Sequence, residues 1–333
     1  MATTTHIRTG AAAALVLAAS ILSVQTRPAP AQSGSACGGP RTLLTAATPS
    51  TLAVTQTLAH PAVSRAAYDW PVKPFDREHP VRGFLDDPRI GSGGSHAFHF
   101  GIDVAAPDGT PVYAVEAGQV FFDSGRSIAV VSGPSHAFGY WHIVPAVKNR
   151  QHVARHQLLG VIDKGWGHVH FAERLNGVYL NPLRRGGLGP YDDTTAPEIA
   201  AVSLVRTGDG SLTVLANAYD MPSLQVPGDW ANEPVTPALL RWRVLRDGSP
   251  AGSWRTAADF RDRMIDAKRY DSIYAPATTQ NHKGKPGLFC FYLSDSWKPA
   301  DGSYRIEVQA FDTRDNHADA RLDFSVENGS VQS

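Results

Sequence analysis

Short apolar runs separated by turn residues dominate the first half of the chain. Four of them lie at 110–123, 127–132, 138–144 and 158–163, and all are rich in β-branched and aromatic residues. Gly, Pro and Asp interrupt the runs, and none of them keeps a helical period over ten residues. The pattern predicts an antiparallel β domain with almost no helix, which we place at residues 68–191.

A second series of apolar runs extends from 199 to 326. Asp-Gly and Gly turns separate these runs at intervals typical of an immunoglobulin- or fibronectin-like β-sandwich. The stretch 255–286 breaks this rhythm, and we interpret it as either a short helix or an irregular loop. The fold class we expect is therefore mainly β, with an antiparallel β-sheet domain followed by an immunoglobulin-like β-sandwich at 197–327.

The N-terminus has the three parts of a secretory signal. A polar start with Arg8 precedes an apolar run at 11–24, and small residues follow at 29–31. We expect a cleaved signal peptide at 1–31, because the apolar run is too short and too rich in Ala for a membrane span. Residues 32–67 are expected to form a linker or a poorly ordered segment. These features predict a secreted, periplasmic or cell-wall-associated protein with no stable membrane insertion after cleavage.

The composition excludes one class of partner. The 333 residues include 31 basic and 31 acidic side chains, and aromatic residues are not interleaved with basic ones in any patch. Nucleic-acid binding is therefore not expected. The two cysteines, Cys37 and Cys290, are too few for a disulfide scaffold or a cysteine metal site. An exported protein could pair them, but Cys37 lies in a Ser/Gly-rich segment and Cys290 in an apolar run, so their pairing stays open.

Histidines cluster in the first of the two domains, where eight of the 13 fall between His96 and His170. His168 and His170 share one face of a predicted strand, with side chains about 6–7 Å apart. One ring can then bind a metal while the other reaches a water or a substrate. The alternative is a pair that only lines a polar cleft. Glu173 falls on the opposite face, and we interpret it as a structural or rim residue.

Two further stretches supply candidate partners for this pair. His99 and Asp103 would lie about 13 Å apart in a regular strand, too far to share an ion. Gly101 between them permits a bend, and His96 is the competing ligand. His142 has aromatic neighbours, and on its own it is interpreted as a buried or cleft histidine.

A His, Asp, His set of ligands leaves the fourth position of a tetrahedral zinc ion open, as catalysis requires. Two more histidines nearby could accept the proton of a water and stabilise an oxyanion on an attacked carbonyl. Other hydrolase signatures, such as HExxH or GxSxG, do not occur in the sequence. The residue types therefore point to metal-assisted hydrolysis.

The order and context of these residues resemble those of the LytM/lysostaphin-type zinc metallopeptidases. The resemblance extends from Trp70 to Pro190 and rests on the motifs HFGID, APDGTPVYAVEAGQV, YWH and HVHF. It implies an exported endopeptidase that hydrolyses peptide bonds of bacterial peptidoglycan by attack of a zinc-bound water. It also implies an antiparallel β fold with a narrow groove above the metal.

The resemblance assigns roles to particular side chains. It implies one Zn²⁺ per chain, with metal ligands His99, Asp103 and His170 and a catalytic pair made by His142 and His168. Two bulky residues, at 141 and 166, stand where smaller ones are common in the family. The groove is therefore expected to differ in shape, which leaves the exact substrate undefined.

Two alternatives come from other classes of protein. In the first, a metallopeptidase fold does not catalyse but binds the cell wall or activates another hydrolase; the presence of all five site residues favours the enzyme. In the second, the β-sandwich is the functional half and its tryptophans stack on sugar, although core packing is their commoner role. The acidic turn at 312–316 is interpreted as ordinary turn chemistry rather than a calcium site.

Overall fold

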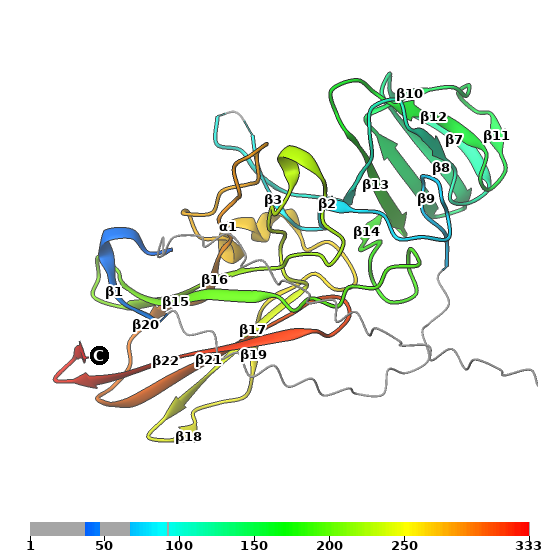
Figure 1. Cartoon of the computed structure of the whole chain (residues 1–333). Coiled ribbons are helices and arrows are strands. Elements are labelled where there is room, and N and C mark those ends of the chain that lie inside the picture. Colours follow the sequence, from blue (N-terminus) through cyan, green and yellow to red (C-terminus); the bar gives the residue numbers. More distant parts are fainter. Residues whose placement is uncertain (1–36, 47–66, 92, 333) are drawn as a thin grey trace, which may run out of the picture. The chain divides into compact units, whose positions relative to one another are not determined.

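The structure is a computed structural model that describes residues 37–46, 67–91 and 93–332 (Figure 1). Almost all of its regular elements are strands, and the named strands pair antiparallel. The prediction of a mainly β chain is thereby confirmed. Within the described residues, no helix has the length and apolar character needed to cross a bilayer. The signal peptide expected at 1–31 lies outside the described residues.

The first domain is built on one large sheet. Its strands follow the order β11-β7-β8-β9-β13-β5-β2, and β14 pairs with β13. Their bounds are β2 Val81–Gly83, β5 Ile102–Ala105, β7 Gly118–Ser124, β8 Ser127–Gly133, β9 His136–Trp141, β11 His152–Val153, β13 His168–Leu175 and β14 Val178–Leu180. Along β13, Val169 and Phe171 pack into the apolar core, so His168 and His170 alternate onto the opposite face.

Two small sheets accompany the large one. The first contains β10 (Ile143–Pro145), β12 (Leu158–Ile162) and β6 (Pro111–Tyr113), and the second contains β3 (Pro88–Ile90) and β4 (His96–Phe98). The three-stranded sheet contributes fully buried side chains such as Ile143 and Leu159 to the same core as the large sheet. The core therefore packs against one face of β13, and His168 and His170 project from the other face.

The second domain is a β-sandwich of two sheets with the orders β1-β15-β16-β20 and β18-β17-β21-β22-β23, and β19 pairs with β17. The strand bounds are β1 Thr42–Ala46, β15 Glu198–Arg206, β16 Leu212–Tyr219, β17 Leu239–Arg246, β18 Ser249–Pro250, β19 Arg255–Asp259, β20 Cys290–Trp297, β21 Gly302–Phe311, β22 His317–Glu327 and β23 Ser330–Gln332. Short helical turns occur at Gly39–Arg41, Gly228–Trp230 and Ala267–Arg269, and α1 spans Tyr270–Ile273. The irregular stretch 255–286 thus contains a short helix.

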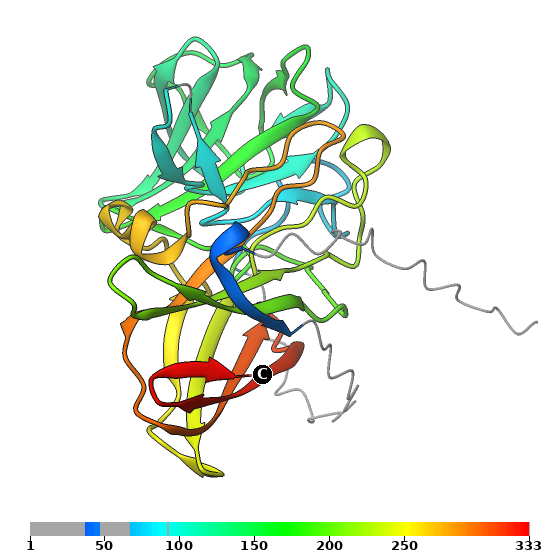
Figure 2. The same ribbon diagram turned by 90° about the vertical axis from the view of Figure 1, so that its left-hand side faces the viewer.

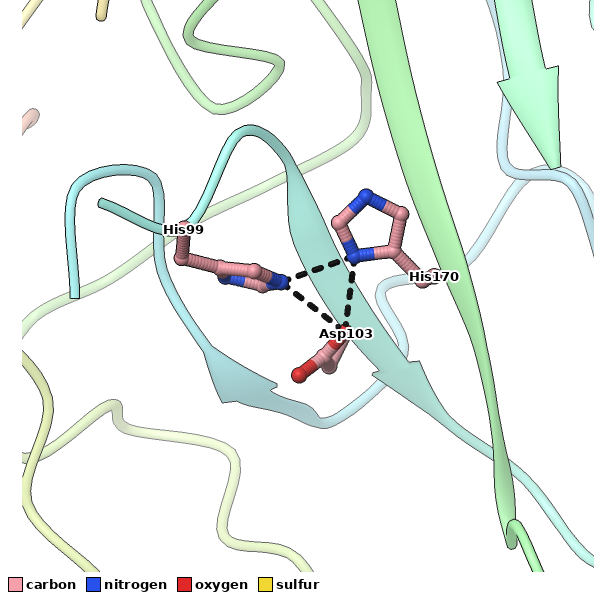
Figure 3. A group of neighbouring side chains, drawn as sticks. All are labelled: His99, Asp103 and His170. Atoms are coloured by element: carbon pink, nitrogen blue, oxygen red, sulfur yellow. Dashed lines mark hydrogen bonds and ion pairs between the residues drawn. The ribbon is translucent and has the colours of Figure 1, made fainter. Parts of the chain in front are cut away.

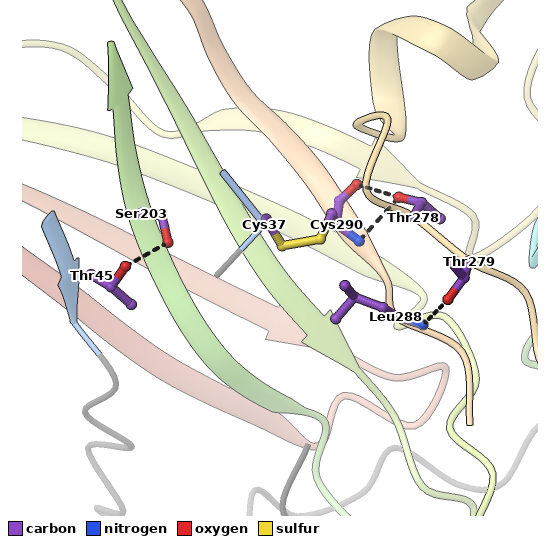
Figure 4. Close-up of a disulfide and its surroundings, with 7 residues drawn as sticks. All are labelled: Cys37, Thr45, Ser203, Thr278, Thr279, Leu288 and Cys290. Carbon is purple, nitrogen blue, oxygen red and sulfur yellow. Dashed lines mark hydrogen bonds between the residues drawn. A yellow bond between two sulfur atoms is a disulfide. The ribbon is translucent and has the colours of Figure 1, made fainter. Parts of the chain in front are cut away.

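Within the segment 32–67, the described residues 37–46 differ from the expectation of a linker. Its residues 42–46 form β1, which pairs antiparallel with β15 and lies along the sandwich (blue in Figure 2). A disulfide joins Cys37 to Cys290 in β20, across a sequence separation of 253 residues (Figure 4). The linker expectation is therefore wrong for these residues, because a strand and a covalent bond fix them to the second domain.

Contacts from the β-sandwich hold the segment that leads into the histidine cluster. Phe98, at the end of β4, is buried in the sandwich core. The Tyr274 hydroxyl donates to the carbonyl oxygen of Asp86 (2.9 Å), and the Thr236 amide donates to Asp87 Oδ1 (2.8 Å). The limits 68–191 and 197–327 remain our proposed domain boundaries, but the packing across them positions the first domain's cluster.

Candidate metal centre

The register of two neighbouring strands brings the expected ligands together. His170 in β13 is the direct cross-strand partner of Asp103 in β5. His99 lies just before β5, and the chain bends at Gly101, so its ring reaches the same point (Figure 3). A Cβ on Gly101 would collide with the Phe171 carbonyl oxygen and lie 2.9 Å from His170 Nε2. Glycine is needed there because the two strands approach so closely.

Three atoms converge on one point in this cluster. His99 Nε2 lies 2.7 Å from His170 Nδ1 and 3.1 Å from Asp103 Oδ1, and the last two atoms are also 3.1 Å apart (Figure 3). Zinc ligands at about 2.0–2.1 Å in a tetrahedron are separated by about 3.3 Å, so small adjustments would accommodate the ion. All three residues are buried, with exposures of 4%, 8% and 4%. The donor set therefore fits a metal ion.

Hydrogen bonds outside the cluster orient these ligands. His99 Nδ1 lies 2.8 Å from the Phe84 carbonyl oxygen, so Nδ1 donates and Nε2 keeps its lone pair for the cluster. Arg89, in β3, donates to Asp103 Oδ2 at 3.1 Å and leaves Oδ1 facing the two rings. Sequence reasoning missed Arg89, because nothing in its local context distinguishes it from a surface arginine.

The protonation states of the three groups also suit a metal. Burial lowers the pKa of His99 to about 3 and lowers that of His170 in the same direction. Burial alone would raise the pKa of Asp103, but the imidazoles around it and their hydrogen bonds hold it well below its usual value. Neutral imidazole and ionised carboxylate are the forms that bind metals.

The remaining two predicted residues lie beside the cluster. His168 Nε2 is 3.4 Å from Asp103 Oδ1, and the ring of His142 lies 4.7 Å from that of His168 between centroids. His142 follows β9 with a φ of 65°, a left-handed conformation that turns its side chain toward β13. Burial lowers the pKa of His142 to about 3, so its ring is neutral near pH 7. The structure thus brings all five predicted residues together.

Arg82 is a further residue that sequence reasoning missed. Its guanidinium lies 2.6 Å from His168 Nδ1, and the same nitrogen lies 2.8 Å from the Trp166 carbonyl oxygen. Because a guanidinium only donates, His168 accepts from Arg82 only when Nδ1 is unprotonated and the proton sits on Nε2. Arg82 also covers the ring of Trp230 at 4.0 Å, so the second domain helps to hold it.

A cleft of about 580 Å³ opens onto the cluster. The two bulky residues of the motifs line it: Trp166 stacks on His142 at 3.6 Å, and Trp141 contacts the edge of His170 at 5.0 Å. The β-sandwich domain contributes another part of the lining, which includes Trp230 and the stretch 280–282. Gln280 accepts a hydrogen bond from the backbone of β3 at 2.5 Å, which ties this part of the lining to the first domain.

Two other candidates lie away from the cleft floor. His96 pairs with Asp271 at 2.8 Å on the partly exposed side of β4, and it does not join the cluster. Glu173 is buried on the other face of β13, where Arg184 and the Tyr68 hydroxyl bond its carboxylate. Glu173 is therefore a structural residue, in agreement with its position on the strand.

Comparison with known proteins identifies one family. Residues 97–182 match the family described as peptidase family M23. No curated protein matches the chain. The similar solved structures include a zinc-containing peptidase from Vibrio cholerae, with 22% identity and a TM-score of 0.30 over 35% of this chain and 39% of that one. A mutant catalytic domain of the prophage-encoded M23 protein EnpA from Enterococcus faecalis has 28% identity and a TM-score of 0.26, over 33% and 95%. The M23 metalloprotease pseudoalterin from the deep sea has 14% identity and a TM-score of 0.27, over 57% and 98%.

Proposed function

We propose, from the premise that residues 97–182 form a peptidase family M23 domain, that the chain is an exported zinc-dependent endopeptidase acting on bacterial peptidoglycan. The observation that carries the proposal is the convergence of one ligand atom each from His99, Asp103 and His170 beneath an open cleft. The disulfide between Cys37 and Cys290 agrees with export, because such bonds persist in oxidising compartments.

In this proposal His99 Nε2, Asp103 Oδ1 and His170 Nδ1 hold one Zn²⁺. The ion supplies a Lewis acid that polarises a carbonyl and activates water near neutral pH. Three protein ligands would leave one coordination position of the ion for water, as in catalytic rather than structural zinc sites. Arg89 donates to Oδ2 of Asp103 and thereby holds Oδ1 toward the two imidazole ligands.

His142 and His168 handle the proton and the developing charge. The ring of His142 lines the cleft, 4.7 Å from the ring of His168 between centroids, and is placed to accept a proton from the attacking water. When Arg82 donates to Nδ1 of His168, the proton on Nε2 points toward Asp103 and the cleft. It can then donate to the oxyanion that forms on the attacked carbonyl. Arg82 is thus a positioning residue for His168.

A digest of purified peptidoglycan tests the proposal. The protein without residues 1–31 is incubated with the polymer, with and without a zinc chelator, and mass spectrometry identifies new peptide termini. Chelator-sensitive cleavage is expected. The alternative function, a cell-wall-binding protein or an activator of another hydrolase, would give no new termini although each chain binds one zinc ion.

A further inference from the structure

We propose that Asp193, Asp220 and Asp312 form a second metal site, which binds a calcium ion where the two domains join. Asp193 lies in the segment before β15, Asp220 directly follows β16, and Asp312 directly follows β21. One carboxylate oxygen from each residue lies within 4.8 Å of the others. Oxygens that share one Ca²⁺ at 2.3–2.6 Å are at most about 5 Å apart, so this spacing suits the ion.

The three carboxylates are buried and form no direct ion pair among the described residues, and the charge of Arg314 acts on Asp312 and Asp193 only from farther away. Their residues are 3%, 1% and 2% exposed, and no Lys, Arg or His of the described chain forms an ion pair with them. Arg314 is the nearest candidate cation, but its guanidinium donates to the carbonyl oxygens of Tyr191 and Leu183 instead. Buried charges without partners are strongly unfavourable, so the cluster needs either a bound cation or bound protons.

A lone oxygen within the cluster favours the cation. Oδ1 of Asp220 accepts from the Met221 amide at 2.8 Å, whereas Oδ2 is buried and, among the described residues, has no hydrogen-bond partner. Burial and the facing carboxylates of Asp193 and Asp312 raise the pKa of Asp220 well above its usual range. A proton on Oδ2 would neutralise Asp220 alone and leave the charges of Asp193 and Asp312 facing each other, whereas one cation interacts with all three groups.

The other two carboxylates are already fixed in place. Asp193 Oδ1 accepts from the hydroxyls of Thr195 and Ser223, each at 2.7 Å. Asp312 Oδ1 accepts from the amides of Arg314 and Asn316, each at 2.8 Å. The acidic turn therefore has the turn chemistry expected from its sequence, but its carboxylate also faces two acids from distant segments. Each carboxylate offers about four lone-pair sites, so these bonds leave room for a metal.

The ligand chemistry separates this site from the histidine cluster. Its donors are oxygen alone, which suits a hard cation such as Ca²⁺ rather than Zn²⁺, and Ca²⁺ tolerates irregular coordination better than Mg²⁺. The Asn316 side-chain amide donates to the Asp193 carbonyl oxygen at 2.8 Å and Arg314 donates to Tyr191, so the site also bonds the connecting segment to the sandwich. Calcium would therefore fix the second domain, which lines the cleft, to the first.

Thermal unfolding of the zinc-loaded full chain tests this inference. After passage over a chelating resin and reloading with zinc, Ca²⁺ or Mg²⁺ is titrated and the Tm is followed. At about 100 times its Kd, Ca²⁺ is expected to raise the Tm by about 5 °C or more. Asp220→Asn and Asp312→Asn should remove the response, whereas Asp319→Asn, at an exposed carboxylate of β22, should keep it.

Asp220→Asn is expected to fold, because it removes one of three facing negative charges. A missing Tm response in this variant can therefore be attributed to loss of the ligand rather than to unfolding. No shift with 10 mM Ca²⁺, an equal shift with Mg²⁺, or a shift that survives in Asp220→Asn would each overturn the inference.

Terbium luminescence gives a second readout. The Tyr191 hydroxyl donates to Asp193 Oδ2 at 3.1 Å, so excitation of this ring should sensitise Tb³⁺ bound at the site. In the wild type, added Ca²⁺ should displace Tb³⁺ and so quench the luminescence. The Asp220→Asn variant should show no sensitised luminescence. A signal that Asp220→Asn leaves unchanged contradicts the site. Neither experiment measures peptide-bond cleavage, so a failure here is distinct from a failure of the proposed peptidase activity.

Discussion

The two candidate metal sites differ in how the negative charge of their buried carboxylates is balanced. The first group is the histidine cluster around Asp103, and the second group is the cluster of three aspartates. Asp103 lies among three imidazoles and accepts a hydrogen bond from Arg89. Asp193, Asp220 and Asp312 face one another, and no described residue forms an ion pair with them. The first group offers nitrogen and oxygen to a tetrahedral metal, and the second offers oxygen alone to a hard cation. Donor chemistry, rather than acidity or burial, therefore separates the proposed zinc site from the proposed calcium site.

Glu173 provides a reference for both groups. It is as deeply buried as they are, but Arg184 bonds both oxygens of its carboxylate at the other face of β13. This acid needs no metal, because a side chain supplies the positive charge.

The largest expected effect comes from removing an imidazole of the first group. His170→Ala should abolish stoichiometric zinc binding and reduce peptidoglycan cleavage by at least about 10³-fold, because the ion and its chemistry are lost together. Metal analysis and a turbidity assay measure the two quantities. His96→Ala is the matched control and should keep both, since His96 pairs with Asp271 away from the cluster. A normal zinc content in His170→Ala would contradict the ligand assignment.

A separation of zinc binding from turnover is the next largest effect. His142→Ala should lower kcat about 10²–10⁴-fold while zinc stays bound, because the ring acts in proton transfer and is not among the three ligands. Steady-state kinetics and metal analysis of the same sample check this. Unchanged turnover would remove His142 from the proposed mechanism.

Substitution of Glu173 should lower the stability of the fold and leave metal binding unchanged. Glu173→Gln leaves Arg184 without its buried partner and should lower the free energy of unfolding by about 3–5 kcal/mol at pH 7. Burial opposes ionisation of Glu173, but its bonds to Arg184 and Tyr68 lower its pKa below the usual value. The stabilisation is therefore complete above the unfolded pKa, near 4.5, and is lost as the pH falls through the folded pKa.

Denaturant unfolding of wild type and Glu173→Gln from pH 7 to pH 3 measures this difference. The two proteins should converge toward the acid end of the range. Glu116→Gln, which disrupts a partly exposed pair with Arg155, is the control and should change stability by less than about 1 kcal/mol. A gap between wild type and Glu173→Gln that stays constant with pH would contradict the ionised pair.

The smallest effect tests the contribution of the second domain to the cleft. Trp230→Ala removes the ring over which Arg82 lies and opens one wall of the cleft. Because a cation–π contact contributes about 0.5–2 kcal/mol, its loss should lower kcat/KM by less than about 30-fold and leave the zinc content unchanged. Trp254→Ala is the control, because that tryptophan does not line the cleft and contacts Arg241 and Arg243. Equal kinetics for the two variants would remove the sandwich wall from substrate binding.

The parts that could be predicted from the sequence have short-range causes. Alternation along β13 placed His168 and His170 on one face and Glu173 on the other, because strand geometry alone sets these directions. Turn residues between apolar runs indicated the β class. The glycine at 101 was expected to allow a bend, although the structure shows that close packing against β13 also requires it.

The parts that could not be predicted depend on contacts between distant segments. Pairing of β1 with β15 and the disulfide from Cys37 are long-range, so local composition indicated only a linker. Arg82 and Arg89 gain their roles when β2 and β3 meet the histidine strands. The three acids of the second group come from segments that no spacing rule connects.

Restoration of cleavage by zinc tests whether the His99, Asp103 and His170 cluster holds a catalytic ion. Chelated protein is given increasing Zn²⁺ with purified peptidoglycan, and mass spectrometry counts the new amino termini against zinc bound per chain. In the wild type, cleavage should return in proportion to bound zinc and saturate at one ion per chain, while His142→Ala should bind the same ion and stay inactive. Cleavage without zinc, or an inactive wild type with one ion bound, would contradict this role of the cluster.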